Sequence, residues 1–170
     1  MNKSHKSGFT LIEILIVIAI VGLLAAIILS SINSAKVKTR NSQRNSDTKQ
    51  LLNAFSLGLA NSPIPSTGGS WACVSSSCYG GWSPFVANST VDSYISPYIT
   101  KPTDPANSSR GYGGYLYNSS YGATGYDGTV FPTGAYIIWL LETNPTPTSC
   151  GAGSIFAIQS NYVQCFLKVN

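Results

Sequence analysis

The sequence predicts an α+β protein in which a long N-terminal helix packs on a small antiparallel sheet. Residues 9–32 are an apolar run, and residues 33–61 continue without proline and with apolar residues at helical spacing. Short runs rich in branched and aromatic residues follow near the C-terminus and are typical of strands. We therefore expect a polar leader at 1–8, a membrane-spanning helix at 9–32, an amphipathic helix at 33–61 and a globular head at 62–170.

The apolar run holds 24 residues, of which only Glu13 is ionisable. As a helix rising about 1.5 Å per residue it would be about 36 Å long, enough to cross the roughly 30 Å core of a bilayer. A buried acid at a helix centre costs about 2.5–3.5 kcal/mol, and less near an end, so such a residue usually has a partner. Alternatively, Glu13 reaches the interface or becomes protonated.

The segment before the apolar run is short, polar and cationic, and it ends at Gly8. A secretory signal is cleaved after its hydrophobic stretch, near small residues. In this chain the natural junction lies before the stretch, between Gly8 and Phe9.

The residues G-F-T-L-I-E, from Gly8 to Glu13, resemble the processing site of type IV prepilins and type II secretion pseudopilins. The resemblance implies that a prepilin peptidase cuts after Gly8 and methylates the new amine of Phe9. It also implies that Glu13 pairs with the N-terminal amine of a neighbouring subunit. In a low-dielectric medium two opposite charges offset much of the cost that each bears alone.

The same resemblance implies partners and a location. The partners would be further copies or related pilin subunits, the peptidase, an assembly platform protein and an ATPase. The chain would cross the inner (cytoplasmic) membrane once with its head outside, and later lie in a cell-surface or periplasmic filament. The positive-inside rule favours the opposite orientation, because two lysines precede the span and four cations follow it: Lys36, Lys38, Arg40 and Arg44.

Beyond Ile32 the pattern predicts that the helix continues to Asn61, for a total length of about 80 Å. An apolar stripe at helical spacing would pack on the head, and Pro63 and Pro65 would end the helix. The stripe comprises Leu51, Leu52, Phe55 and Leu59. Family members commonly carry a proline near the position of Ser30, whereas this chain offers only Gly22 as a weak point.

Four cysteines fall in the head, at Cys73, Cys78, Cys150 and Cys165. An even number after a membrane span fits an oxidising compartment. Three connectivities are possible, and sequence order favours Cys73 with Cys78 and Cys150 with Cys165. The alternatives are free thiols or a zinc site, but the gaps fit the usual metal-ligand spacings poorly.

Residues 62–134 are rich in Ser, Gly, Pro, Asn and Tyr and predict long loops pinned by the first cysteine pair. Within them, P-T-D-P at 102–105 followed by Y-L-Y at 115–117 resembles a pattern of the major pseudopilins. The usual Trp-Gly after Asp-Pro is replaced by Ala106-Asn107. Five tyrosines nearby form either an adhesive surface or the cover of a small sheet: Tyr112, Tyr115, Tyr117, Tyr121 and Tyr126.

The clearest strand is Ala135 to Leu141, and Ser154 to Ile158 with Tyr162 to Val169 predict a hairpin. One face of the resulting sheet would lie against the helix stripe. The residues predict an α+β arrangement, and the resemblance to prepilins implies that it is pilin-like.

The residue inventory argues against an enzyme. The single histidine is His5, in the leader, which removes the usual nucleophile–histidine pairs, and no phosphate-binding glycine motif is present. The head has three cations and four acids, so it offers no basic patch for nucleic acid. We expect its acids to be scattered and exposed, and we assign no metal and no cofactor: Asp92, Asp104, Asp127 and Glu142.

The sequence thus predicts a structural, prepilin-like filament subunit of a type IV pilus or a secretion pseudopilus. The alternative is a membrane-anchored adhesion or binding module that does not polymerise.

Overall fold

The structure is a computed structural model that describes residues 8–80, 85, 87–105 and 113–169. The chain divides into two compact units, one ending at Lys36 and one beginning at Val37. The leader apart from Gly8, the Ala106-Asn107 pair and Tyr112 lie outside the described residues.

Helix α1, Leu11–Leu59, confirms the predicted long helix to within two residues at each end. In the first unit its apolar side chains are exposed, and the stretch is long and apolar enough to cross a membrane. The helix runs through Gly22 without interruption. Its end is marked by the Ser62 amide, which donates to the carbonyl of Gly58 at 3.0 Å, shortly before Pro63.

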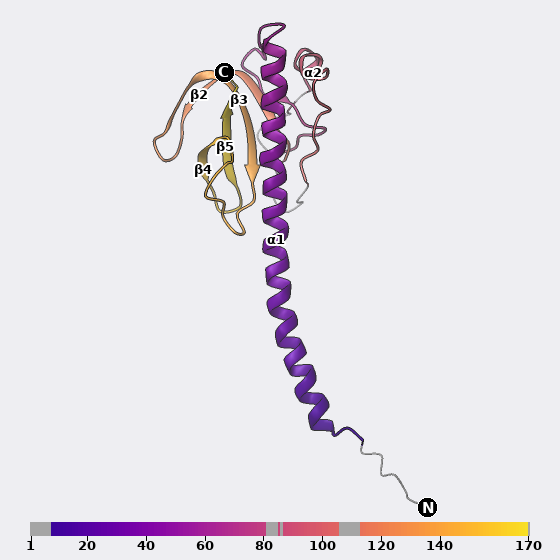
Figure 1. Cartoon of the computed structure of the whole chain (residues 1–170). Helices are drawn as coiled ribbons and strands as arrows, with labels where there is room; N and C mark the ends of the chain where they lie inside the picture. The colour runs from indigo at the N-terminus through magenta and orange to yellow at the C-terminus, as the bar shows by residue number, and fades with distance from the viewer. Residues whose placement is uncertain (1–7, 81–84, 86, 106–112, 170) are drawn as a thin grey trace, which may run out of the picture. The chain divides into compact units, whose positions relative to one another are not determined.

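The second unit holds one antiparallel sheet of five strands in the order β1-β2-β3-β5-β4. Figure 1 shows β2, β3, β5 and β4 beside one another. The strands are β1 Ala72–Cys73, β2 Leu116–Thr124, β3 Val130–Leu141, β4 Ser154–Ile158 and β5 Val163–Lys168.

The strands confirm the three runs predicted from sequence. Strand β3 begins five residues earlier than expected, at Val130, because Val130 pairs with Thr124 of β2. The β4–β5 hairpin lies where the sequence places it.

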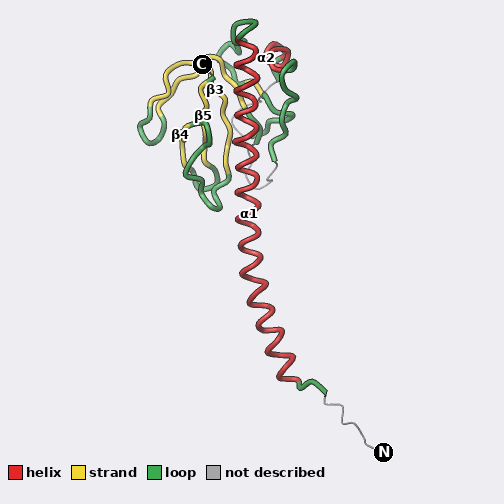
Figure 2. Tube along the Cα trace, in the orientation of Figure 1, coloured by secondary structure: helices red, strands yellow, loops and turns green. Residues whose placement is uncertain are grey.

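The prediction that residues 62–134 are loops before the tyrosine strand is wrong in two places, the short strand β1 and a helix. Helix α2, Ser89–Ile95, lies within them, beside the upper part of α1 in Figure 2. The side chain of Asn88 caps this helix by accepting from the amides of Thr90 and Val91. Only Val91 and Ile95 are buried, so seven residues carry too little apolar periodicity to reveal the helix.

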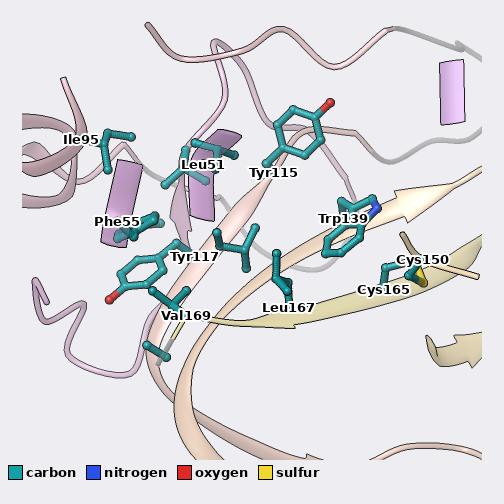
Figure 3. Close-up of a cluster of buried hydrophobic side chains, with 14 of the residues drawn as sticks. Leu51, Phe55, Ile95, Tyr115, Tyr117, Trp139, Cys150, Cys165, Leu167 and Val169 are labelled. Carbon is teal, nitrogen blue, oxygen red and sulfur yellow. A yellow bond between two sulfur atoms is a disulfide. The ribbon is translucent and has the colours of Figure 1, made fainter. Parts of the chain in front are cut away.

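The main core lies between α1 and one face of the sheet (Figure 3). Leu51 and Phe55 of α1 are fully buried, and the ring of Phe55 stacks on Tyr117 with centroids 4.5 Å apart. Leu59, expected in the same stripe, is instead 47% exposed. Gly58 takes its place, because the ring of Tyr94 lies so close that a β-carbon there would be 2.4 Å from it.

The opposite face of the sheet carries a second, aromatic cluster of Phe131, Tyr136, Ile138 and Phe166. Residues 135, 137, 139 and 141 of β3 face the main core, and residues 136 and 138 face this second cluster. Both faces of β3 are therefore apolar, which explains why its sequence is almost continuously hydrophobic.

The tyrosines largely cover the sheet, as the second of the two interpretations predicts. Tyr115 and Tyr117 are fully buried, Tyr121 is half-buried and Tyr126 is 79% exposed. Burial raises the pKa of Tyr117 far above its usual range.

Two disulfides staple the head, Cys73–Cys78 and Cys150–Cys165. Sequence order favours this same pairing. The first closes a loop with a separation of 5 residues and the second a loop of 15.

We predict that the longer loop contributes more to stability. In the chain-entropy description, replacing Cys150 and Cys165 by alanine lowers the free energy of unfolding by about 3 kcal/mol, and replacing Cys73 and Cys78 by about 2 kcal/mol. Urea unfolding of the full chain in detergent, followed by tryptophan fluorescence, to which the buried Trp139 contributes, measures both. A larger loss from the short loop would contradict the prediction.

Candidate functional site

The start of α1 brings Thr10 and Glu13 together. The amide and the hydroxyl of Thr10 each donate to Oε2 of Glu13 at 2.7 Å, and the amide of Glu13 donates to the Thr10 hydroxyl at 3.3 Å. This reciprocal arrangement is a capping box, which satisfies amides that the first helical turn leaves free. The T-x-x-E spacing could have predicted it, but the sequence analysis considered Glu13 only as a charge.

Glu13 keeps capacity for another partner. Its side chain is exposed, and within the described part of the chain no cation lies within ion-pair distance of it. Its hydrogen bonds from Thr10 use Oε2 alone. An ionised carboxylate can accept about four hydrogen bonds, so Oε1 remains open to a positive group from outside.

The expected cleavage junction is exposed. Phe9 is 86% exposed, and a β-carbon placed on Gly8 would meet no atom within 4 Å. Gly8 and Phe9 precede the helix and have no regular secondary structure. A peptidase therefore has unhindered access to this bond in the described structure.

The large apolar side chains that follow, from Leu11 to Ile32, are all exposed. A soluble monomer rarely exposes so large a contiguous apolar surface. Lipid or other apolar helices must cover it.

A second polar site, the Arg44 cluster, joins α1 to the head through Arg44, Asp104, Glu142, Arg40 and Asn41. Arg44 is fully buried, its Nε lies 2.6 Å from Oδ1 of Asp104, and its Nη1 lies 2.8 Å from Oε1 of Glu142. A buried guanidinium is tolerated only with such charged partners.

The remaining members of the cluster complete its hydrogen bonding. Nε of Arg40 donates to Oε1 of Glu142 at 2.7 Å, and this bond raises the pKa of Arg40. Asn41 pairs with the backbone of Glu142 in both directions, at 3.0 and 2.9 Å. Asp104 also accepts from the amide of Gly114 at 2.7 Å.

The Arg44 cluster corrects the expectation that the head's acids are exposed. Asp104 and Glu142 are 9% and 3% exposed, and Asp92 pairs with Lys101 at 2.5 Å. Of the head's four acids, only Asp127 is both exposed and free of an ion pair within the described residues. Arg44 thus holds the P-T-D-P turn against α1, and its side chain also donates to the carbonyl of Pro105. Sequence reasoning counted Arg44 only as a cation after the span.

Further along α1, polar side chains of the helix accept hydrogen bonds from aromatic residues of the head. The hydroxyl of Tyr115 donates to Oδ2 of Asp47 at 2.7 Å, and Nε1 of Trp139 donates to Oδ1 of Asn45 at 3.0 Å. Burial raises the pKa of Asp47 and that of Tyr115. The carboxylates near α1 are therefore committed to structural contacts.

The described residues offer no candidate metal site. Among the described residues no group of three His, Cys, Asp or Glu side chains is placed to hold a metal ion. All four cysteines are in disulfides.

Comparison with known proteins bears on the first of the two sites. Residues 3–29 match the family described as "Prokaryotic N-terminal methylation motif". The type II secretion system core protein G of Aeromonas hydrophila is 37% identical over 68 residues, which are 39% of this chain and 48% of that protein. Part of the chain is thus similar to part of a type II secretion system protein, and the chain carries the methylation motif. No solved structure is significantly similar to it.

The match to the methylation motif includes Gly8, Phe9, Glu13 and Gly22 and ends before the Arg44 cluster. The matched stretch of the Aeromonas protein spans about half of that protein's length. The pilin-type N-terminus is thus joined to a head whose own attachment to α1 is built from Arg44 and its partners.

We predict that Arg44→Gln destabilises the head by about 3–5 kcal/mol, because it leaves buried carboxylates without their main cation. Arg40→Gln is the matched control and should cost about 1 kcal/mol or less, since Arg40 is partly exposed and Arg44 still faces Glu142. Urea unfolding of both full-length variants measures the difference. Equal losses would show that Arg44 is not the centre of the cluster.

Proposed function

We propose that the chain is a structural filament subunit of a type IV pilus or a type II secretion pseudopilus. It is cut after Gly8, methylated on Phe9 and polymerised through the apolar part of α1. The observation that carries the proposal is an exposed apolar helix that begins directly after an accessible Gly-Phe junction and carries one acid, Glu13.

The apolar surface supports two successive surroundings. Before assembly it suits the hydrocarbon core of a membrane, and within a filament it suits packing against the same helix of other copies. Both surroundings exclude water from the same side chains. A subunit can therefore move from one to the other without exposing them.

Glu13 supplies the specificity that apolar packing lacks. Cleavage after Gly8 creates an amine on Phe9, and this amine and the Glu13 carboxylate are each costly in an apolar medium. Pairing the amine of one copy with Oε1 of another neutralises both charges and fixes how far one helix is displaced along the next. The capping box leaves that oxygen open.

The disulfides support a head that lies outside the cytoplasm, in an oxidising compartment. The proposed route is a single pass through the inner membrane, followed by incorporation into a periplasmic or surface filament. Prepilin peptidase, a platform protein, an assembly ATPase and related pilins are the proposed partners. The similarity to core protein G supports the secretion pseudopilus among these routes.

The adhesion-module alternative depended on an exposed tyrosine surface. Tyr115 and Tyr117 are buried in the main core, which removes two tyrosines from that surface. The proposal therefore remains with assembly.

Three variants of the assembly helix test the role of the Glu13 charge. Glu13→Gln keeps a capping side chain but removes the charge, Glu13→Ala removes both, and Thr10→Val removes the capping hydroxyl but keeps the charge. We expect both Glu13 variants to lose filaments, or incorporation into filaments, by at least about tenfold, which corresponds to a lost pairing of about 1.4 kcal/mol or more per subunit. Thr10→Val should assemble.

The measurement is the yield of sheared filaments in cells that carry the peptidase and assembly machinery. Membrane insertion and disulfide formation of each variant serve as controls. Normal filaments from Glu13→Gln would show that assembly does not need the Glu13 charge. Loss of filaments from Thr10→Val alone would show that Glu13 acts through the capping box.

A further inference from the structure

The turn between β2 and β3, here called the hairpin tip (residues 124–130), is ordered although little covers it. The Gly125 amide donates to the carbonyl of Thr129 at 2.8 Å, and the Thr129 amide donates to Oδ1 of Asp127 at 2.9 Å. The Tyr126 amide donates to the carbonyl of Phe156 in edge strand β4 at 3.0 Å. The tip is therefore fixed in place before anything binds to it.

The hairpin tip presents exposed apolar surface. Tyr126 is 79% exposed and Val130 is 70% exposed, and the Tyr126 ring meets Phe156 only edge-on, with centroids 6.4 Å apart. Most other tyrosines of the head are buried or half-buried. An exposed aromatic ring beside a second exposed apolar side chain, on a turn held by hydrogen bonds, suits a protein contact.

The hairpin tip also holds a free negative charge. In residues 62–170 the other three acids are in ion pairs, whereas Asp127 has no cation within ion-pair distance in the described structure. Hydrogen bonds from Thr129 lower the pKa of Asp127, so it is ionised at neutral pH.

Two lysines on α1 complement this charge. Lys36 and Lys38 are exposed, and within the described chain neither has a carboxylate at ion-pair distance. The next two cations, Arg40 and Arg44, are already held by Glu142 and Asp104. The free positive charge nearest the apolar segment is therefore at Lys36 and Lys38.

We infer that the hairpin tip of one copy docks on α1 of a second copy at Lys36 and Lys38, with Asp127 pairing with a lysine and Tyr126 lying over its ammonium group. The inference rests on the proposed function, because polymerisation through the apolar segments would bring the start of one copy's head-bound helix beside the heads of others. Both contacts are attractive for a lysine. Other exposed lysines fit less well: Lys168 lies on β5, with its Cε 3.2 Å from the β-carbon position of Gly134.

Cysteine crosslinking between two differently substituted copies tests the contact. The natural cysteines are paired, so new ones at position 127 of one copy and 38 of the other would be the only free thiols in the described residues. We expect oxidised dimers from D127C with K38C in assembled filaments, and at least about fivefold fewer from D127C with K49C. Lys49 is the control because it is an exposed lysine on the same helix.

Charge variants provide the second measurement, without new thiols. Asp127→Asn keeps the acceptor for the Thr129 amide but removes the charge, and should lower filament yield by about two- to fivefold, the range expected for a surface ion pair. K36E/K38E should do the same, and adding Asp127→Lys to K36E/K38E should restore the yield. Raised salt should weaken the wild type and leave Asp127→Asn unchanged.

The outcomes separate this inference from the proposed function. Filaments that assemble in a Glu13-dependent way but show no 127–38 crosslink would overturn the docking contact alone. Absence of filaments from the wild type would overturn the proposed function. If K36E/K38E alters only extraction from anionic membranes, and Asp127→Asn has no effect, the lysines bind lipid and the inference is wrong.

Discussion

The rest of the structure depends on the need to cover a helix whose surface changes character along its length. From Leu11 to Ile32 the large apolar side chains of α1 have no cover from the described residues. From Arg40 onward the helix is covered by its own head, first through ions and hydrogen bonds and then, from Leu51, through apolar packing. Apolar side chains must be shielded from water in both parts. The first part therefore needs lipid or other subunits, and the second part is shielded by the head, which stays packed on the helix.

The Arg44 cluster and the hydrophobic core divide the work of attaching the head. Apolar packing around Phe55 stabilises the attachment but is not directional. Arg44, in contrast, must meet Asp104 and Glu142 at defined positions. One buried residue thereby fixes the P-T-D-P turn and the end of β3 against one turn of α1. Four cations follow the span, and the positive-inside rule counts them against a head outside the cytoplasm. Within the described structure Arg40 and Arg44 are held by carboxylates of the head, whereas Lys36 and Lys38 have no ion pair.

The sequence was most informative where the signal is local. The methylation motif is contained in residues 3–29, the strands show their branched and aromatic runs, and neighbouring cysteines pair in order. It was least informative where partners are distant: Arg44 is 60 residues from Asp104 and 98 from Glu142, and no periodicity links them. Leu59 and Gly58 show a related limit, since the approach of Tyr94 decided which of two adjacent positions was buried.

The central claim is that the apolar helix becomes an assembly helix through cleavage before it. The most direct test is co-expression of the full chain with a prepilin peptidase, followed by N-terminal sequencing and intact mass. The account predicts a mature chain that starts at Phe9, carries one added methyl group and has lost four hydrogens to two disulfides. Cleavage after Ser31, or no cleavage, would contradict it.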